Sequence, residues 1–168
     1  MLLDTRRLTL RCLDLDDAPF FLRLVNDPSF IANIADKGVR TLDDARENLR
    51  NGPIASYARH GHGLWMVELK DTGTPIGICG LIKRDVLDDI DVGYALLPEF
   101  CGQGYAAEAA AAALAYGRET LGLQRVVAVV NAENARSLRL LEKLGFRYER
   151  MVRLSPNDRE IQLLAFAT

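Results

Sequence analysis

The chain has 168 residues, of which 49% are hydrophobic and 26% charged, which suits a single folded domain over residues 1–168 and argues against a disordered chain. Its formal net charge of -2 argues against nucleic acid or an anionic membrane as a partner. Three widely spaced cysteines, and no apolar run of the length that a signal peptide or a membrane span needs, predict a cytoplasmic protein.

The first third of the chain predicts one strand followed by two helices. Polar and apolar residues alternate over 7–13, which is the period of a half-buried strand. Acids and a proline precede apolar residues at helical spacing over 14–27, which indicates a helix. A second helix is predicted over 41–51, where the hydroxyl of Thr41 can cap it, and the segment 28–40 is predicted as loop or irregular helix.

The rest of the chain predicts a meander and then helix–strand units. Strands of the meander are predicted at 64–70, 76–84 and 90–97. The later predicted elements are a helix after Gly104, an apolar strand over 124–131, a helix over 133–145 and a final hairpin over 146–152 and 159–166. This order predicts an α/β (α+β) fold, a mixed and mostly antiparallel sheet of about seven strands with about four helices against its faces.

The stretch PEFCGQGYAAEAAAAALAYGRE, from Pro98 to Glu119, places a glycine-rich turn directly before a helix. Such a helix start leaves backbone N–H groups unpaired beside the positive end of the helix dipole, so it favours an anion. GQGYAA also matches G-x-G-x-x-A, the weak form of a dinucleotide-binding fingerprint. Against that interpretation, an antiparallel meander comes first, residues 98–101 separate the strand from the first glycine, and the next strand ends in Asn131 rather than an acid.

Three blocks, TRRLTLRCLDLDDA, IDVGYALLPEFCGQGYAAEA and NAENARSLRLLEKLGF, follow one another along nearly the whole chain. In this order and spacing they resemble the GNAT acyl-CoA N-acyltransferases, in particular the RimJ/RimL-type branch of ribosomal-protein N-terminal acetyltransferases. The resemblance implies a GNAT-like fold, with two parallel strands splayed in the middle of the sheet. It implies acetyl-CoA as co-substrate and an amine as acceptor.

The resemblance also implies where acetyl-CoA is held. The pantetheine arm enters the gap between the splayed strands and pairs with exposed backbone, and the diphosphate lies on N–H groups of the glycine turn and helix start. Asn134 either contacts the pantetheine or caps its helix, and the two roles are compatible. The implied cofactor-binding residues are Ala95, Leu96, Leu97, Gly102, Gln103, Gly104, Tyr105, Ala106, Ala107, Asn134 and Ser137.

The reaction needs a neutral amine and a proton for the departing thiolate. Asp91 is the candidate base and acceptor-binding acid, and the alternative is a solvated acid at a strand end. Many family members use a tyrosine of the closing helix as the proton donor, but the matching position here is Leu141. Ser137, one turn earlier, is the candidate replacement, with a surface serine as the alternative. Tyr94 is a candidate for lining the acceptor pocket, unless it is simply packed on the sheet.

Other residues carry weaker signals. Cys101 stands where the broad family pattern has Arg or Gln; as an acyl-carrying nucleophile it would need a base, and no histidine is close in sequence. His60 and His62 lack a third ligand nearby, so no metal is predicted. A basic cluster that flanks the first strand consists of Arg6, Arg7 and Arg11.

The sequence therefore predicts an N-acetyltransferase that transfers the acetyl group of acetyl-CoA to a primary amine by direct attack in a ternary complex. Its acceptor is left open among a protein N-terminus, a polyamine, an amino acid and an antibiotic amine. The alternative is a catalytically inactive acyl-CoA-binding regulatory protein, because the helix tyrosine is missing. Similar proteins commonly dimerise through an edge strand, so the resemblance leaves a homodimer open.

Overall fold

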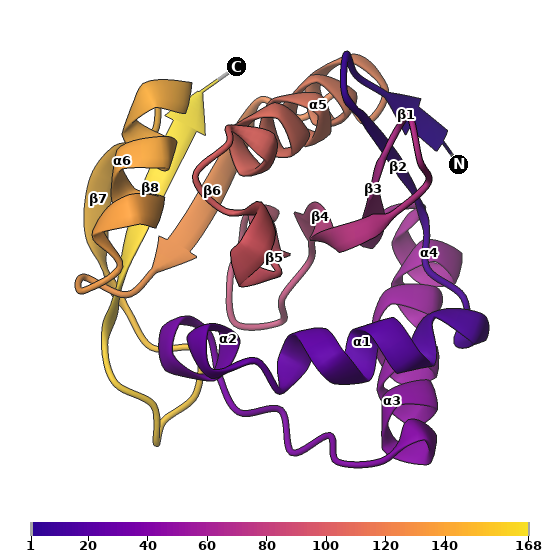
Figure 1. Ribbon diagram of the computed structural model, residues 1–168. Coiled ribbons are helices and arrows are strands. Elements are labelled where there is room, and N and C mark those ends of the chain that lie inside the picture. The colour runs from indigo at the N-terminus through magenta and orange to yellow at the C-terminus, as the bar shows by residue number, and fades with distance from the viewer. Residues whose placement is uncertain (1, 168) are drawn as a thin grey trace.

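The computed structural model describes residues 2–167, which form one open, mixed, eight-stranded sheet in the order β1-β2-β3-β4-β5-β6-β8-β7 (Figure 1). The strands are β1 (Leu2–Asp4), β2 (Leu8–Cys12), β3 (Leu64–Leu69), β4 (Pro75–Ile82), β5 (Asp91–Leu96), β6 (Arg125–Val130), β7 (Arg147–Val152) and β8 (Ile161–Ala167). The α-helices are α1 (Ala18–Val25), α2 (Pro28–Asn33), α3 (Leu42–Leu49), α4 (Ala55–His60), α5 (Tyr105–Glu119) and α6 (Ala135–Leu144). The predicted fold class is confirmed.

The centre of the sheet is splayed between β5 and β6. These two strands are parallel, and the register between them consists of one pair, Asp91 with Val127, whereas β6 and β8 pair along six residues. Figure 1 shows α6, β7 and β8 on the left, β1 to β3 on the right and β5 between them. Because the strands separate after Asp91, the later part of β5 has no strand partner on its β6 side.

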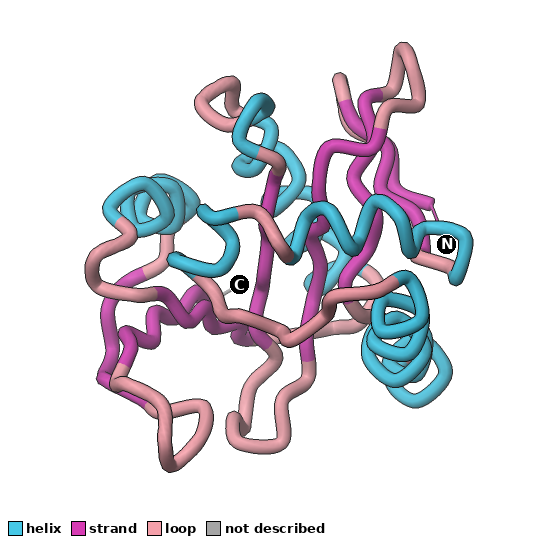
Figure 2. Tube along the Cα trace, turned by 60° about the horizontal axis from the view of Figure 1, so that its bottom comes forward, coloured by secondary structure: helices cyan, strands magenta, loops and turns pink. Residues whose placement is uncertain are grey.

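Helices cover both faces of the sheet. Side chains alternate between faces along a strand. In β3, Trp65 and Val67 pack in one core cluster with Ala109 of α5 and Leu141 of α6, whereas Met66 packs with α1 and α3 in a second cluster. Figure 2, in which strands are magenta, shows cyan helices in front of the strands and behind them. The cluster of α5 and α6 and the cluster of α1 and α3 therefore lie on opposite faces.

The alanine run of α5 has a packing role besides its helix propensity. Ala109, Ala110 and Ala113 are fully buried in the core cluster of this face. Alanine is the strongest helix former, and its small side chain lets the helix axis approach the sheet closely. The N-terminus of α5 is thereby held beside the end of β5.

Two helical segments differ from the prediction. The helix that was predicted to end near Asn51 continues through a π-helical turn, Arg50–Ile54, into α4, which ends where Gly61 adopts a left-handed φ of 79°. A π turn changes the hydrogen-bond register, so it accommodates Pro53, whose missing N–H would interrupt an ordinary α-helix. In the segment 28–40, α2 forms because the Asp27 side chain accepts from the N–H of Ser29 and caps it.

The sheet also has one strand more than the about seven predicted. The extra strand is β1, three residues that pair with β2 through Leu2–Arg11, Leu3–Leu10 and Asp4–Thr9. So short a segment carries too little alternation to be recognised from sequence. Within residues 2–167, no helix combines the length and the apolar character that crossing a bilayer requires.

Candidate functional site

A cleft of about 960 Å³ follows the gap between β5 and β6. On one face of the sheet it is lined by the first turn of α5 and by α6, and elsewhere by α2 and α4. Both strands contribute residues of both faces, including Tyr94 and Ala95 of β5. The cleft therefore passes through the sheet.

The glycine turn at the start of α5 leaves backbone N–H groups unpaired at the helix end. Gly102 and Gly104 have φ angles of 80° and 84°, a left-handed conformation that glycine adopts without strain. Gly104 is the N-cap residue, no side chain caps this helix end, and the first donor inside the helix is the Glu108 N–H, 3.1 Å from the Gly104 oxygen. The N–H groups of Tyr105, Ala106 and Ala107 precede this donor and line the cleft, so they are free for an anion.

Arg7, directly before β2, holds this turn, although it is 96 residues away from Gln103 in sequence. Its Nη1 donates to the Gln103 carbonyl oxygen at 3.0 Å. In a planar trans peptide the C=O and the following N–H point in opposite directions, so this bond turns the Gly104 N–H away from Arg7. The guanidinium also lies 4.3 Å from the centroid of the Tyr105 ring and 3.4 Å from Glu108 Oε1. Arg7 thus fixes the backbone of the glycine turn.

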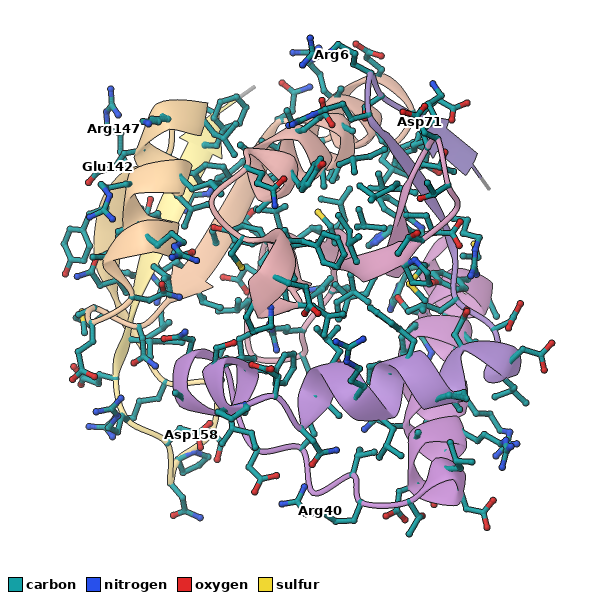
Figure 3. The ribbon with its side chains drawn as sticks, in the orientation of Figure 1. Arg6, Arg40, Asp71, Glu142, Arg147 and Asp158 are labelled. Atoms are coloured by element: carbon teal, nitrogen blue, oxygen red, sulfur yellow. The ribbon has the colours of Figure 1, made fainter. Side chains whose placement is uncertain are left out.

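The three arginines of the basic cluster therefore have different surroundings. Figure 3 shows Arg6 pointing outward at the β1–β2 turn. Arg11 pairs with Asp17 at 2.9 Å and with Glu68 at 3.2 Å. Sequence reasoning placed all three arginines beside the strand and missed the role of Arg7, because no local pattern records a contact that depends on tertiary packing.

The backbone of β5 is turned alternately to β4 and to the gap. The Leu97 N–H donates to the Ile76 oxygen at 2.9 Å, and the Leu97 oxygen accepts from the Phe100 N–H at 3.0 Å. In this antiparallel register Ala95, like Leu97, directs its backbone groups to β4, whereas Leu96 directs its own to the gap. Of the three residues predicted to pair with an extended ligand, Leu96 is the one whose backbone faces the gap.

Two hydroxyl groups meet across the cleft. Tyr94 Oη and Ser137 Oγ share a hydrogen bond of 2.6 Å, which joins β5 to α6. Asn134 caps α6, and its Oδ1 accepts from the Ser137 N–H at 3.3 Å. Burial raises the pKa of Tyr94 to about 12, against the opposing effect of the Ser137 hydrogen bond, so its hydroxyl stays protonated at neutral pH. Leu141, which stands where the resemblance implies a tyrosine in many family members, is buried.

Asp91 lies at the point where β5 and β6 separate, and its side chain is only 1% exposed. Its Oδ2 accepts from Arg84 Nε at 3.2 Å, and its Oδ1 is buried without a hydrogen-bond partner in residues 2–167. Burial raises the pKa of this carboxyl, and the charge of Arg84 partly opposes the rise. Asp91 is therefore not the solvated strand-end acid that the sequence left as an alternative.

The remaining candidates have other partners. The Cys101 thiol lines the cleft and donates to the Leu97 oxygen at 3.7 Å. His62 is buried, with Nδ1 2.8 Å from the Leu81 oxygen, and its ring centroid lies 5.9 Å from that of His60. Among the residues that the structure describes, no group of three or more His, Cys, Asp and Glu side chains is arranged to hold a metal ion.

Comparison with known proteins gives consistent matches. A family model described as an acetyltransferase (GNAT) domain matches residues 7–147. The chain is 33% identical over 155 residues to the uncharacterized protein YkkB of Bacillus subtilis (strain 168), covering 89% of this chain and 87% of that protein. It is 31% identical over 151 residues to the uncharacterized N-acetyltransferase p20 of Bacillus licheniformis, with coverage of 89% and 84%.

Solved structures with the same fold include two acetyltransferases. One, from Agrobacterium tumefaciens str. C58, has a TM-score of 0.85 and 28% identity, with coverage of 100% of this chain and 95% of that chain. The other is RimL, a ribosomal L7/L12 alpha-N-protein acetyltransferase in complex with coenzyme A. Its TM-score is 0.85 at 16% identity, with coverage of 99% and 98%, which shows a shared fold.

Proposed function

The chain belongs to the GNAT acetyltransferase family, and we propose that it transfers the acetyl group of acetyl-CoA to a primary amine by direct attack in a ternary complex. The observation that carries this proposal is the cleft through the sheet, which has an uncapped helix N-terminus on one side. The acyl donor enters from the face of α5 and α6, and the amine from the side of α2 and α4. Both reactants then meet between β5 and β6.

The residues of the α5 and α6 face fit coenzyme A. The free N–H groups at the start of α5 suit its diphosphate, and Arg136, Arg139 and Lys143 of α6 line the same cleft with positive charge. The backbone of Leu96 faces the gap, where it is placed to pair with an extended amide chain. Bound acetyl-CoA would supply the activated acetyl thioester.

The proposed proton transfers involve two sites in the cleft. Asp91 receives the proton of the amine at Oδ1, the oxygen that Arg84 leaves without a partner. A raised pKa brings a carboxyl closer to the pH at which a general base works well. Ser137 Oγ donates a proton to the departing thiolate and recovers one from Tyr94 Oη, and the proton that Asp91 has taken from the amine returns to Tyr94 through solvent, so that the net transfer is from the amine to the thiol.

Ser137→Ala and Tyr94→Phe are each expected to lower kcat about tenfold, because general acid catalysis typically contributes a factor of about 100 or more and the two hydroxyls can partly substitute for each other. The double variant should lose less than the product of the two single losses, since both act through one hydrogen bond. Steady-state kinetics with saturating acetyl-CoA measures this. Tyr148→Phe, at an exposed position of β7, is the matched control. Unchanged kcat in both single variants would remove these hydroxyls from the mechanism.

Arg7→Met is expected to weaken acetyl-CoA binding about tenfold, the effect of losing one hydrogen bond to a charged group, with kcat at saturation unchanged. The physical reason is that the Gln103–Gly104 peptide is no longer held with its N–H toward the ligand. Calorimetric titration with acetyl-CoA measures the change. Arg6→Met, the neighbouring exposed arginine, should bind like the wild type (Figure 3). Equal losses in both variants would show a general charge effect instead.

The proposed function is tested by following free-thiol release while acetyl-CoA and an amine are both varied, over a panel of peptides, amino acids, polyamines and antibiotic amines. Saturable release with intersecting double-reciprocal plots supports direct attack in a ternary complex. Parallel plots would indicate a covalent acyl-enzyme, for which Cys101 supplies the thiol among the described residues that line the cleft. Tight binding without release over the whole panel would favour the inactive regulatory protein.

A further inference from the structure

The charged side chains that line the cleft are nearly all positive, although the whole chain has a net charge of -2. Among the described residues that line it, Asp91 is the one carboxylate. Its lysines and arginines are Lys37, Arg59, Lys83, Arg84, Arg136, Arg139 and Lys143. A cleft of this kind concentrates anions.

The phosphates of coenzyme A account for only part of this charge. The three cations of α6 lie on the face where the diphosphate site is. The other four belong to the segment after α2, to α4 and to the segment directly after β4, on the acceptor side. One of these, Lys83, is already bound to backbone, with Nζ 2.6 Å from the Leu87 oxygen. Binding of the acyl donor does not account for the positive charges of Lys37, Arg59 and Arg84.

Arg84 presents a preorganised anion-binding group to the cleft. Its Nε is fixed by Asp91 at 3.2 Å, and the guanidinium side chain is 34% exposed whereas the carboxylate is 1% exposed. Its two terminal nitrogens make no hydrogen bond within residues 2–167. A planar guanidinium held in this way binds a carboxylate through two parallel hydrogen bonds. A carboxylate group on an incoming ligand therefore meets the guanidinium first.

Lys37 adds a second positive charge to the same region. Surrounding protein lowers the pKa of Lys37, although its side chain remains accessible from the cleft, and the nearby charge of Arg84 lowers it further. Among the described residues that line the cleft, the one carboxylate is Asp91, which already pairs with Arg84, so an anion that binds near Lys37 and Arg84 is stabilised by both. This pair therefore favours a ligand that carries negative charge.

From this arrangement we propose that the acceptor is an amine that carries a carboxylate close to the reacting nitrogen, and that Arg84 together with Lys37 binds this carboxylate. The inference rests on the proposed function and names the substrate class of the same site. Polyamines and antibiotic amines are disfavoured, because a polycation would be repelled by these side chains. Two sources supply the required chemistry, a free amino acid and a peptide whose first residue is acidic.

The test compares acceptors that differ by one carboxylate, with rates expressed per neutral amine because amidation lowers the pKa of the α-amino group. Methionine is paired with methioninamide, an N-terminal Glu peptide amide with its Gln counterpart, and spermidine serves as the polycation. Wild-type protein should prefer the acid member of at least one pair about tenfold or more in kcat/KM, and Arg84→Gln should reduce that preference to about one. The pair in which the preference appears identifies the source. Lys37→Met should reduce the preference in part and provides a second variant if Arg84→Gln does not fold.

Matched controls are Arg46→Gln and Lys70→Met, which remove exposed cations that do not line the cleft. Both should keep the wild-type preference. Equal rates for acid and amide members, or spermidine as the best acceptor, would overturn the inference while leaving the proposed acetyl transfer intact. If no amine of the panel causes release of free CoA thiol from acetyl-CoA, the proposed function fails. Calorimetric binding of the same pairs in the presence of CoA then decides the inference, since equal or absent binding would overturn it.

Discussion

Valine in place of Gly104 is expected to weaken acetyl-CoA binding about 100-fold or more, because the left-handed backbone alone costs an ordinary residue about 1–2 kcal/mol and the aligned N–H groups are lost with it. Gly104 has a φ of 84°, which a β-branched residue does not adopt without strain. A Cβ at this position would also lie 3.2 Å from Arg7 Nη2, the side chain that holds the turn. The backbone at the start of α5 would therefore leave its binding geometry.

Gly73→Val is the matched control for this variant. Gly73 has a similar φ of 71° in the turn between β3 and β4, with open space around its Cβ position. Both variants should lower the thermal unfolding temperature, since both carry the same backbone strain. Calorimetry should show weakened acetyl-CoA binding for Gly104→Val alone. Wild-type affinity in Gly104→Val, or an equal loss in Gly73→Val, would contradict an anion site at this turn.

Asp91→Asn is expected to lower kcat about 100-fold to 1,000-fold, the usual contribution of a general base, while acetyl-CoA binding stays unchanged. Asparagine keeps the shape of the side chain and can still accept from Arg84 Nε, but it cannot take the proton of the amine. Presteady-state and steady-state rates of thiol release measure the loss. A variant with near wild-type kcat would remove Asp91 from the reaction.

The pH dependence gives an independent check on Asp91. Because burial raises its pKa above the ordinary value of 3.8, wild-type activity should fall on the acid side at a higher pH than an ordinary aspartate would give. Arg84 lowers that pKa, so Arg84→Gln should move the acid limb to still higher pH. Asp91→Asn should lack this limb.

The raised pKa of Asp91 also determines how this residue affects the stability of the fold as the pH changes. A carboxyl whose pKa is raised on folding stabilises the fold only while it is protonated, and the contribution is lost as the pH rises through the folded pKa. Replacing the carboxylate by a neutral amide is therefore not expected to destabilise the fold above that pH. Thermal unfolding of the Asp91→Asn variant separates a loss of chemistry from a loss of structure.

Much of the fold followed from local patterns. The period of two in β2 and the wholly apolar run of β6 predicted strands, and the acid-rich start and glycine end of the helical segments predicted helices. The elements that were not predicted have weak or misleading local signals in the sequence. The strand β1 has too few residues for a period, and Gly52 and Pro53 normally end a helix, whereas here a π turn continues it into α4.

The candidate site could likewise be predicted where it depends on residues adjacent in sequence, but not where it depends on tertiary contacts. The glycine turn and the helix start after it are adjacent in sequence, so the anion site could be derived from a single stretch. The proposed roles of Arg7 and Arg84 rest on partners that tertiary packing brings close, the Gln103 carbonyl and the buried Asp91 carboxylate. The burial of Asp91 arises from the junction of β5 with β6, which the spacing of residues does not record.

The central claim is that an amine attacks acetyl-CoA directly in the cleft through the sheet. The most direct measurement is mass spectrometry of both the protein and the amine after incubation with acetyl-CoA. The predicted result is an amine heavier by one acetyl group, with protein that carries no acetyl group at any time point. An acetylated protein that forms before the product would contradict direct attack, and an unmodified amine despite tight acetyl-CoA binding would contradict acetyl transfer itself.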